Sequence, residues 1–135
     1  MYEVFEHTAD LGLRIRAADL ETLFSDAGKA LVSLIVDLAA VEPRQEATFR
    51  IPGRELDYLL FDWLNELLFA FEKDRLLYCE FSVRRDAEGI TAVARGEPLD
   101  PARHELDHEV KAITYHGLKV QQESDGWLAE LIVDI

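Results

Sequence analysis

Two stretches of the sequence carry hydrophobic residues at helical spacing, and both lie among stretches in which hydrophobic and polar residues alternate. The first helical stretch is 20–38, after the capping residue Asp19, and the second is 54–73. Alternation is typical of β-strands that bury one face. Strand-like segments precede each helix and fill most of the chain after residue 75. Because helices and strands do not alternate regularly, a parallel doubly wound sheet is not expected.

The predicted element order is strand, strand, helix, strand, helix, followed by five strands. The strands are predicted at 2–6, 11–17, 46–51, 76–85, 90–95, 110–115, 118–123 and 127–133. The polar segment 97–109 contains two prolines and two histidines, and is predicted to be a surface loop. This order predicts an α+β fold, with two helices packed on a mainly antiparallel sheet. A length of 135 residues fits one domain, predicted to span 1–135.

The composition narrows the possible functions. The chain has 27 acidic and 14 basic residues, a formal net charge of −13. Such a surface repels phosphate backbones, so strong direct binding of nucleic acid is not expected, whereas cations and basic partner surfaces are favoured. No apolar stretch is long enough to cross a bilayer and the N-terminus does not resemble a secretory signal, so we expect a cytoplasmic protein without a membrane anchor.

Several common kinds of site are not indicated by the sequence. The glycines are scattered and form no phosphate-binding loop. Cys79 is the single cysteine, which excludes intramolecular disulfides and cysteine-based metal clusters, and its alternation with apolar neighbours predicts a small buried hydrophobe. His104 and His108 are predicted to be solvated loop residues, and His116 is expected to have a role in a turn.

Asp10 is the first candidate functional residue. It ends the polar sequence His-Thr-Ala-Asp, which interrupts two apolar strands. One interpretation is a turn in which Asp10 or Thr8 accepts hydrogen bonds from local backbone amides. The other is a carboxylate held on a rigid turn between strands, ready to bind a cation.

Asp134 is the second candidate. The strand pattern continues to Ile135, so the carboxylate of Asp134 and the α-carboxylate of Ile135 are one residue apart. Adjacent oxygen anions repel one another, and a hard divalent cation would relieve this repulsion. Without such a partner, these residues would be only an exposed acidic end.

Lys111 is the third candidate. Alternation places it on one strand face with the apolar residues Ile113 and Tyr115. A lysine in this position usually extends its ammonium group into solvent. It could also pair with carboxylates and help to hold an acidic cluster together.

Taken together, three segments resemble the signatures of the archease family. They are 7–12 (HTADLG), 109–116 (EVKAITYH) and Trp127 with the closing residues 133–135 (VDI). The resemblance is collinear and spans the whole chain. Leu11 and Leu13 stand where isoleucine is common, and 131–133 lack the phenylalanine that often precedes the final aspartate. Neither difference affects a polar candidate residue.

The resemblance implies a function that composition does not indicate. Archeases are protein cofactors, not enzymes, of the GTP-dependent RtcB-type RNA ligase, which acts in tRNA splicing and RNA repair. They promote guanylylation of the ligase's active-site histidine and support multiple turnover. The resemblance implies that Asp10, Asp134 and Ile135 bind a divalent metal ion, expected to be calcium, and that Lys111 is the functional lysine beside them.

Two other functions remain open from the sequence. Some archeases have been linked to tRNA methylation, which suggests a chaperone-like modulator of a tRNA methyltransferase and would require an exposed apolar patch. A metal-dependent hydrolase using Asp10 and Asp134 is the second, although no general base is evident. The metal hypothesis requires the strands that carry Asp10 and Asp134 to be neighbours in one sheet.

Overall fold

The computed structural model describes residues 1–7 and 10–135, with the side chain of His7 excepted. The elements, in chain order, are β1 (Tyr2–His7), β2 (Asp10–Ala17), α1 (Leu20–Ile35), the 3-10 helix η1 (Leu38–Ala40), β3 (Gln45–Pro52), α2 (Leu56–Asp74), β4 (Leu76–Asp86), β5 (Gly89–Pro98), β6 (Ala112–Glu123) and β7 (Gly126–Asp134). None of the helices in these residues is long and apolar enough to cross a membrane.

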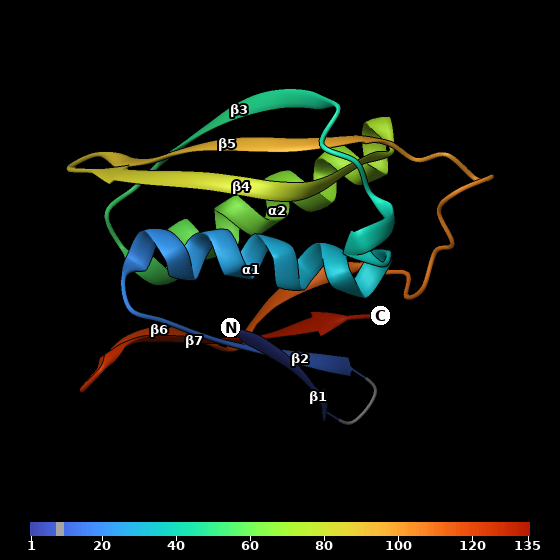
Figure 1. The fold of residues 1–135 in the computed structure, drawn as a ribbon. Helices are drawn as coiled ribbons and strands as arrows, with labels where there is room; N and C mark the ends of the chain where they lie inside the picture. Colours follow the sequence, from blue (N-terminus) through green and yellow to red (C-terminus); the bar gives the residue numbers. More distant parts are fainter. Residues whose placement is uncertain (8–9) are drawn as a thin grey trace.

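The strands form two antiparallel sheets with both helices between them (Figure 1). One sheet has the order β1-β2-β7-β6 and the other has the order β3-β5-β4. The α+β class is confirmed, but the expectation of one sheet is corrected to two. The reason is the width of the helical apolar faces, since α1 contacts both β2 and β4, and α2 contacts both β6 and β4. A helix that is apolar on more than one side needs a covering layer on each.

Local signals set the bounds of the helices. Asp19 accepts a hydrogen bond from the backbone N–H of Thr22 at 2.8 Å and caps α1, as predicted. The helix ends at Ile35 and not, as the spacing predicts, at Leu38, because Val36 adopts an extended conformation. The backbone N–H of Val36 still donates to the carbonyl of Val32 in the last turn. Helix α2 ends at Asp74, because the next residue, Arg75, is in the left-handed conformation with φ of 55°.

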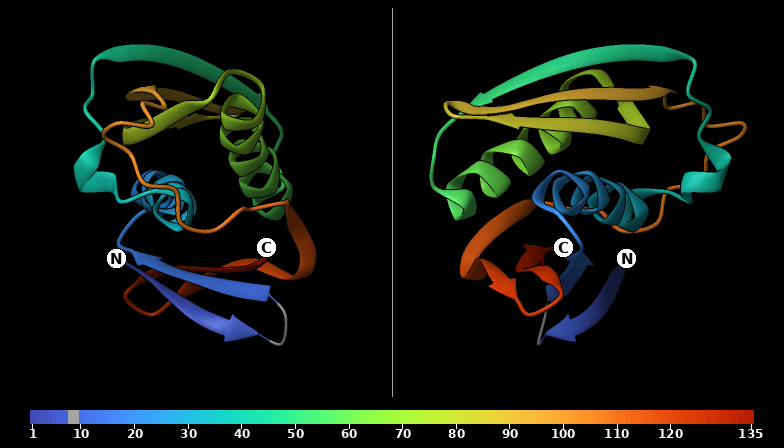
Figure 2. Two further views of the ribbon diagram at one scale, coloured as in Figure 1. Left: turned by 90° about the vertical axis from the view of Figure 1, so that its right-hand side faces the viewer. Right: turned by 60° about the vertical axis from the view of Figure 1, so that its left-hand side comes forward.

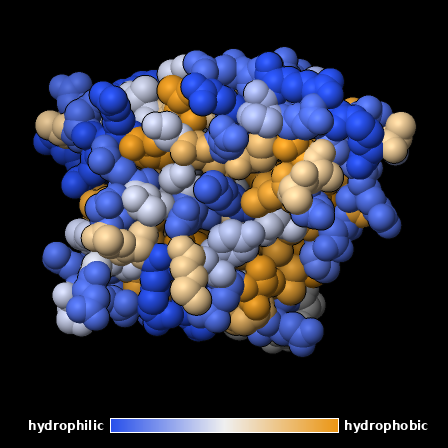
Figure 3. Space-filling view, viewed as in Figure 1, coloured by the Kyte–Doolittle hydropathy of each residue, from blue (hydrophilic) through white to orange (hydrophobic). Residues whose placement is uncertain are grey.

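The core lies between the helices and both sheets, and Trp63 is its largest fully buried side chain. The indole N–H of Trp63 donates to the backbone carbonyl of Phe24 on α1 at 3.0 Å. Its ring makes edge contacts with Phe49 on β3 and Phe81 on β4, both with centroids 5.7 Å apart. A single side chain therefore links α2 to α1 and to the three-stranded sheet. Hydrophilic side chains cover the upper edge of the molecule, outside that sheet (Figure 3).

The region after α2 differs from the prediction. The two strands predicted at 110–115 and 118–123 are one strand, β6, whose pairing with β7 is irregular between Thr114 and Lys119. Gly117 lies in this irregular segment with φ of 68°, a left-handed conformation that costs glycine little. Four strands follow α2, and not five, because the bend does not end the strand.

Candidate metal centre at the end of the four-stranded sheet

Asp10 and Asp134 lie directly opposite one another on neighbouring strands. Asp10 begins β2, Asp134 ends β7, and the antiparallel register pairs the two residues. Directly opposed residues of an antiparallel pair have Cβ atoms about 4.5–5.5 Å apart. The end of the chain and the start of β2 lie at the same end of the lower sheet in Figure 1. The predicted convergence of these two residues is therefore confirmed.

Lys111 and Ile135 lie next to Asp134, at the same end of the four-stranded sheet. The backbone N–H of Lys111 donates to the backbone carbonyl of Asp134 at 2.8 Å, and the next residue, Ala112, pairs with Asp134 in the sheet. The side chain of Lys111 is exposed, and Ile135 is partly buried. Thr8 and Ala9 of the predicted motif lie outside the described residues. Asp134 is thus flanked by β2 on one side and by the Lys111 segment on the other.

The segment that leads to Lys111 is attached to the C-terminal end of α1. The backbone N–H groups of Asp107 and His108 donate to the carbonyls of Ile35 and Leu34, at 2.8 and 2.9 Å. The last carbonyls of a helix have no partner within the helix, so these bonds satisfy them. Val110 is buried against the core. The end of α1 therefore determines where Lys111 meets the sheet.

Glu97 anchors the other end of this segment and is only 2% exposed. Its carboxylate accepts hydrogen bonds from both terminal nitrogens of Arg103, at 2.6 and 3.2 Å, and from the backbone N–H of Glu42 at 2.8 Å. The hydrogen bonds from Arg103, and then those from Glu42 and His104, lower the pKa of Glu97 to about 2 despite burial. A buried carboxylate with this many donors stays charged and fixes the segment to Glu42, just after η1.

The prediction that His104 is solvated is wrong, because it is 4% exposed. Its Nδ1 accepts from the backbone N–H of Asp100 at 2.9 Å, so its proton lies on Nε2, which is 3.0 Å from Glu97 and 3.1 Å from the carbonyl of Ala40. The sequence offers little signal for this contact, because Ala40 and Glu42 are more than fifty residues away. His108 is exposed, as predicted.

Cys79 is partly buried, and its thiol donates to the carbonyl of Arg95 at 3.6 Å. Burial raises the pKa of this thiol. A raised pKa keeps the thiol protonated and therefore unreactive, in agreement with the interpretation of Cys79 as a packing residue.

The basic residues on the outer face of the four-stranded sheet are paired with other acids. Arg14 lies 2.7 Å from Glu130 and 3.3 Å from Glu3, and Lys119 lies 2.9 Å from Glu130. These contacts with Lys119 and Arg14 lower the pKa of Glu130. The charges of Arg14 and Lys119 are therefore already balanced and leave the repulsion between Asp10 and Asp134 in place.

A shallow hollow of about 380 Å³ lies beside this ion-pair row. Phe5, Arg14 and Ile132 are among its lining residues. The Phe5 ring covers Gly12, where a Cβ atom would lie 2.2 Å from the ring. Gly12 pairs with Ile132, one alternation step from the Asp10–Asp134 pair, so the hollow borders the candidate site.

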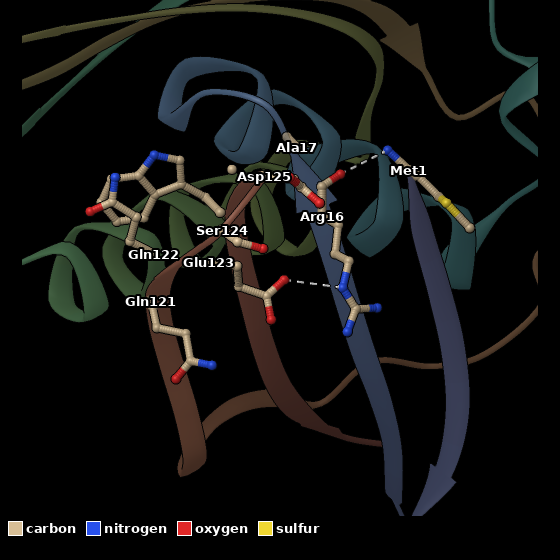
Figure 4. Close-up of a pocket in the computed structure, with 10 residues that line it drawn as sticks. Met1, Arg16, Ala17, Gln121, Gln122, Glu123, Ser124 and Asp125 are labelled. Atoms are coloured by element: carbon tan, nitrogen blue, oxygen red, sulfur yellow. Dashed lines mark hydrogen bonds and ion pairs between the residues drawn. The ribbon is translucent and has the colours of Figure 1, made fainter.

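Another hollow, of about 670 Å³, is at the opposite end of the sheet (Figure 4). It lies at the paired residues Ala17 and Trp127, seven residues along β2 from Asp10. This separation is about 23 Å, taking roughly 3.3 Å per residue. Met1, at its edge, places its ammonium group 2.8 Å from Asp26. Trp127 therefore has no direct part in the candidate metal centre.

The donor set suits a hard cation bound at an open surface. Asp10, Asp134 and the α-carboxylate of Ile135 offer only oxygen ligands, which calcium prefers. Within residues 1–7 and 10–135, no group of three or more histidine, cysteine, aspartate or glutamate side chains could hold a metal ion. The carboxylates therefore fall short of the six to eight ligands that calcium takes. Water or a partner molecule would have to supply the others.

Comparison with known proteins identifies the family. A sequence profile of the archease protein family matches residues 2–135. The archease of Methanopyrus kandleri is 46% identical, with 99% of each chain covered. The solution structure of Methanobacterium thermoautotrophicum protein 1598 has a TM-score of 0.89 at 33% identity, covering 99% of this chain and 98% of that chain. The crystal structure of a Thermotoga maritima archease, described as a possible chaperone, shares the fold with a TM-score of 0.70 at 23% identity, covering 100% of this chain and 98% of that chain. The chain belongs to the archease family.

Proposed function

We propose that this protein is a metal-binding activator of a GTP-dependent RtcB-type RNA ligase, which acts in tRNA splicing and RNA repair, and that it is not itself an enzyme. Membership of the archease family provides the link to the ligase. The direct pairing of Asp10 with Asp134 is the observation that carries the proposal. Like charges directly opposite in a sheet are destabilising, so this arrangement is best explained by a bound cation.

The open geometry suggests how the site would act. The three carboxylates of Asp10, Asp134 and Ile135 would hold one side of a calcium ion and leave coordination positions for a group of the ligase. Lys111, beside Asp134, would offer a positive charge to a phosphate or carboxylate bound in the ligase's active site. With a net charge of −13, the protein would be attracted to a basic RNA-binding cleft, mainly through a faster association rate.

Replacing Asp10 or Asp134 by asparagine is expected to weaken calcium binding and ligase activation roughly tenfold or more, because loss of a direct ligand should cost at least as much as loss of a supporting residue. Calcium affinity is measured by calorimetry on the protein alone, and activation by guanylylation of the cognate ligase at limiting metal. Asp125→Asn, in the turn at the opposite end of the sheet, is the matched control. Unchanged activation by both site variants would overturn the proposal.

Extending the chain beyond Ile135 tests the contribution of its α-carboxylate. Two added residues move this carboxylate away from Asp134 and put an amide in its place. Calcium affinity is expected to fall roughly tenfold, as for loss of a ligand. An extension at Met1, at the other end of the sheet, should leave the affinity unchanged. If the C-terminal extension binds calcium as well as the original chain, Ile135 supplies no essential ligand.

A chaperone-like modulator of a tRNA methyltransferase is the second candidate, and one observation favours it. Tyr58, Phe69 and Tyr115 are each more than half exposed, so they offer apolar surface to a client protein. Suppression of the aggregation of unrelated client proteins would support this function. Activation of the cognate ligase without any effect on unrelated proteins would favour the first proposal.

A further inference from the structure

An aromatic cluster lies on the surface where α2 meets β6. Phe61 stacks on Tyr115 with ring centroids 4.0 Å apart and an interplanar angle of 16°. Tyr58 meets the same ring edge-on at 5.7 Å. Tyr58 is 53% exposed and Tyr115 is 54% exposed, while Phe61 is partly buried beneath them. The three side chains hold one another in position and still present aromatic surface to solvent.

A hydrogen bond also joins the two elements that carry this cluster. The carboxylate of Asp57, in the first turn of α2, accepts a hydrogen bond from the backbone N–H of Val120 on β6 at 2.8 Å. Strand β6 forms an edge of its sheet and runs beside the start of α2 (Figure 2). Binding of a partner here would therefore cost little conformational entropy, because the rings are already held in position. This is the usual property of an interface anchor.

The charge around the cluster is negative. Five acidic residues lie between Glu55 and Glu72, and all five side chains are exposed, while the nearest basic residues of this segment, Arg54 and Lys73, flank it on either side. Asp62 is close enough to Tyr115 that, after burial, its charge contributes to raising the pKa of the tyrosine. Carboxylates at this density repel a phosphate backbone and attract guanidinium and ammonium groups. The surroundings thus select against nucleic acid and in favour of a basic protein surface.

We propose that Tyr58, Phe61 and Tyr115 form the docking anchor for a basic patch of the RNA ligase, with an arginine side chain of the partner lying over the tyrosine rings. This inference rests on the proposed function. An arginine can stack on an aromatic face and pair with a carboxylate such as Asp62 at the same time. Tyrosine and arginine are also the residue types that most often carry binding energy at protein interfaces.

The position of the anchor fits a single partner that also covers the metal centre. Tyr115 is three residues along β6 from Ala112, which pairs with Asp134. The separation is about 10 Å, taking roughly 3.3 Å per residue. An interface of ordinary size buries about 800 Å² on each partner and spans such a distance. The ligase would bind the aromatic cluster while Asp10 and Asp134, at the end of the four-stranded sheet, enter its RNA-binding cleft.

The test is the affinity of the purified protein for the cognate ligase at saturating calcium. Tyr58→Ala and Tyr115→Ala are each expected to weaken binding roughly tenfold or more, as hot-spot residues do. Phe69→Ala, on the same helix and 57% exposed, is the matched control and is expected to change the affinity less than twofold. Asp62→Lys leaves the rings intact but removes a negative charge that would attract a cationic group of the ligase. We expect it to lower the affinity, and we expect the remaining affinity to change less with salt concentration.

The outcomes separate the two proposals. If the unaltered protein does not bind the ligase, the proposed function is wrong. If it binds, and the Tyr58, Tyr115 and Asp62 variants bind equally well, the docking inference is wrong while the function stands. Binding to tRNA without ligase that is lost in Tyr115→Ala would also overturn the docking inference. Asp10→Asn is expected to retain most of the binding at saturating calcium, although it activates the ligase less at limiting calcium, since it alters the metal centre and not the anchor.

Discussion

Replacing Trp63 by alanine is expected to lower the free energy of unfolding by about 3–5 kcal/mol, the usual cost of truncating a large buried aromatic residue. Trp63 is fully buried and connects α2 to α1, β3 and β4 through one hydrogen bond and two ring contacts. Domains of this size are stable by about 5–15 kcal/mol, so the loss would be a large part of the total. Urea unfolding followed by circular dichroism measures it.

Phe69→Ala is the control for this prediction. Phe69 is on the same helix and is also aromatic, but it is 57% exposed. Its truncation is expected to change the free energy of unfolding by less than about 0.5 kcal/mol, as at other surface positions. Equal effects of the two substitutions would show that Trp63 does not have the central packing role that its contacts indicate.

Replacing Glu97 by glutamine is expected to loosen the segment that leads to Lys111. The amide keeps the shape of the side chain, but it removes the charge that Arg103 and His104 surround. The backbone N–H groups of Asp107, His108 and Lys111 should then exchange with solvent roughly tenfold faster or more, because their local opening no longer has to break a charged network. Amide hydrogen exchange measures each of these groups separately.

The same substitution should change the response to acid. The pKa of Glu97 is lowered from an ordinary value of 4.5 to about 2 in the folded protein, chiefly by Arg103. Ionised Glu97 therefore stabilises the fold fully above about pH 4.5, and this contribution is lost as the pH falls from 4.5 through about 2. Glu97→Gln is expected to lose less stability than the unaltered protein across this range.

Glu46→Gln provides the matched control. Glu46 pairs with Arg95 at 3.0 Å, but both side chains are more than half exposed. An exposed ion pair contributes little to stability, so neither the exchange rates nor the acid response should change. If Glu97→Gln behaves in the same way as Glu46→Gln, the buried carboxylate does not hold the Lys111 segment.

Much of the secondary structure follows from short-range signals. Asp19 marks the start of α1, and the sequence between Asp86 and Gly89 forms the hairpin turn that joins β4 and β5, as predicted. These signals involve residues within a few positions of one another, so the sequence shows them directly. The irregular pairing of β6 around Gly117 was predicted as a break between two strands, because a polar, glycine-containing segment does not distinguish a bend from a strand end.

The sequence by itself determined the α+β class, the approximate bounds of the helices, the family resemblance and the candidate residues Asp10, Lys111, Asp134 and Ile135. Only the tertiary structure decided that there are two sheets, that Asp10 is directly opposite Asp134, and that Glu97 and His104 are buried together. It also brought Tyr58 to Tyr115, which is 57 residues away in the chain. The physical reason is that periodicity shows which face of an element is apolar, whereas the partner of that face is decided by packing across the whole chain.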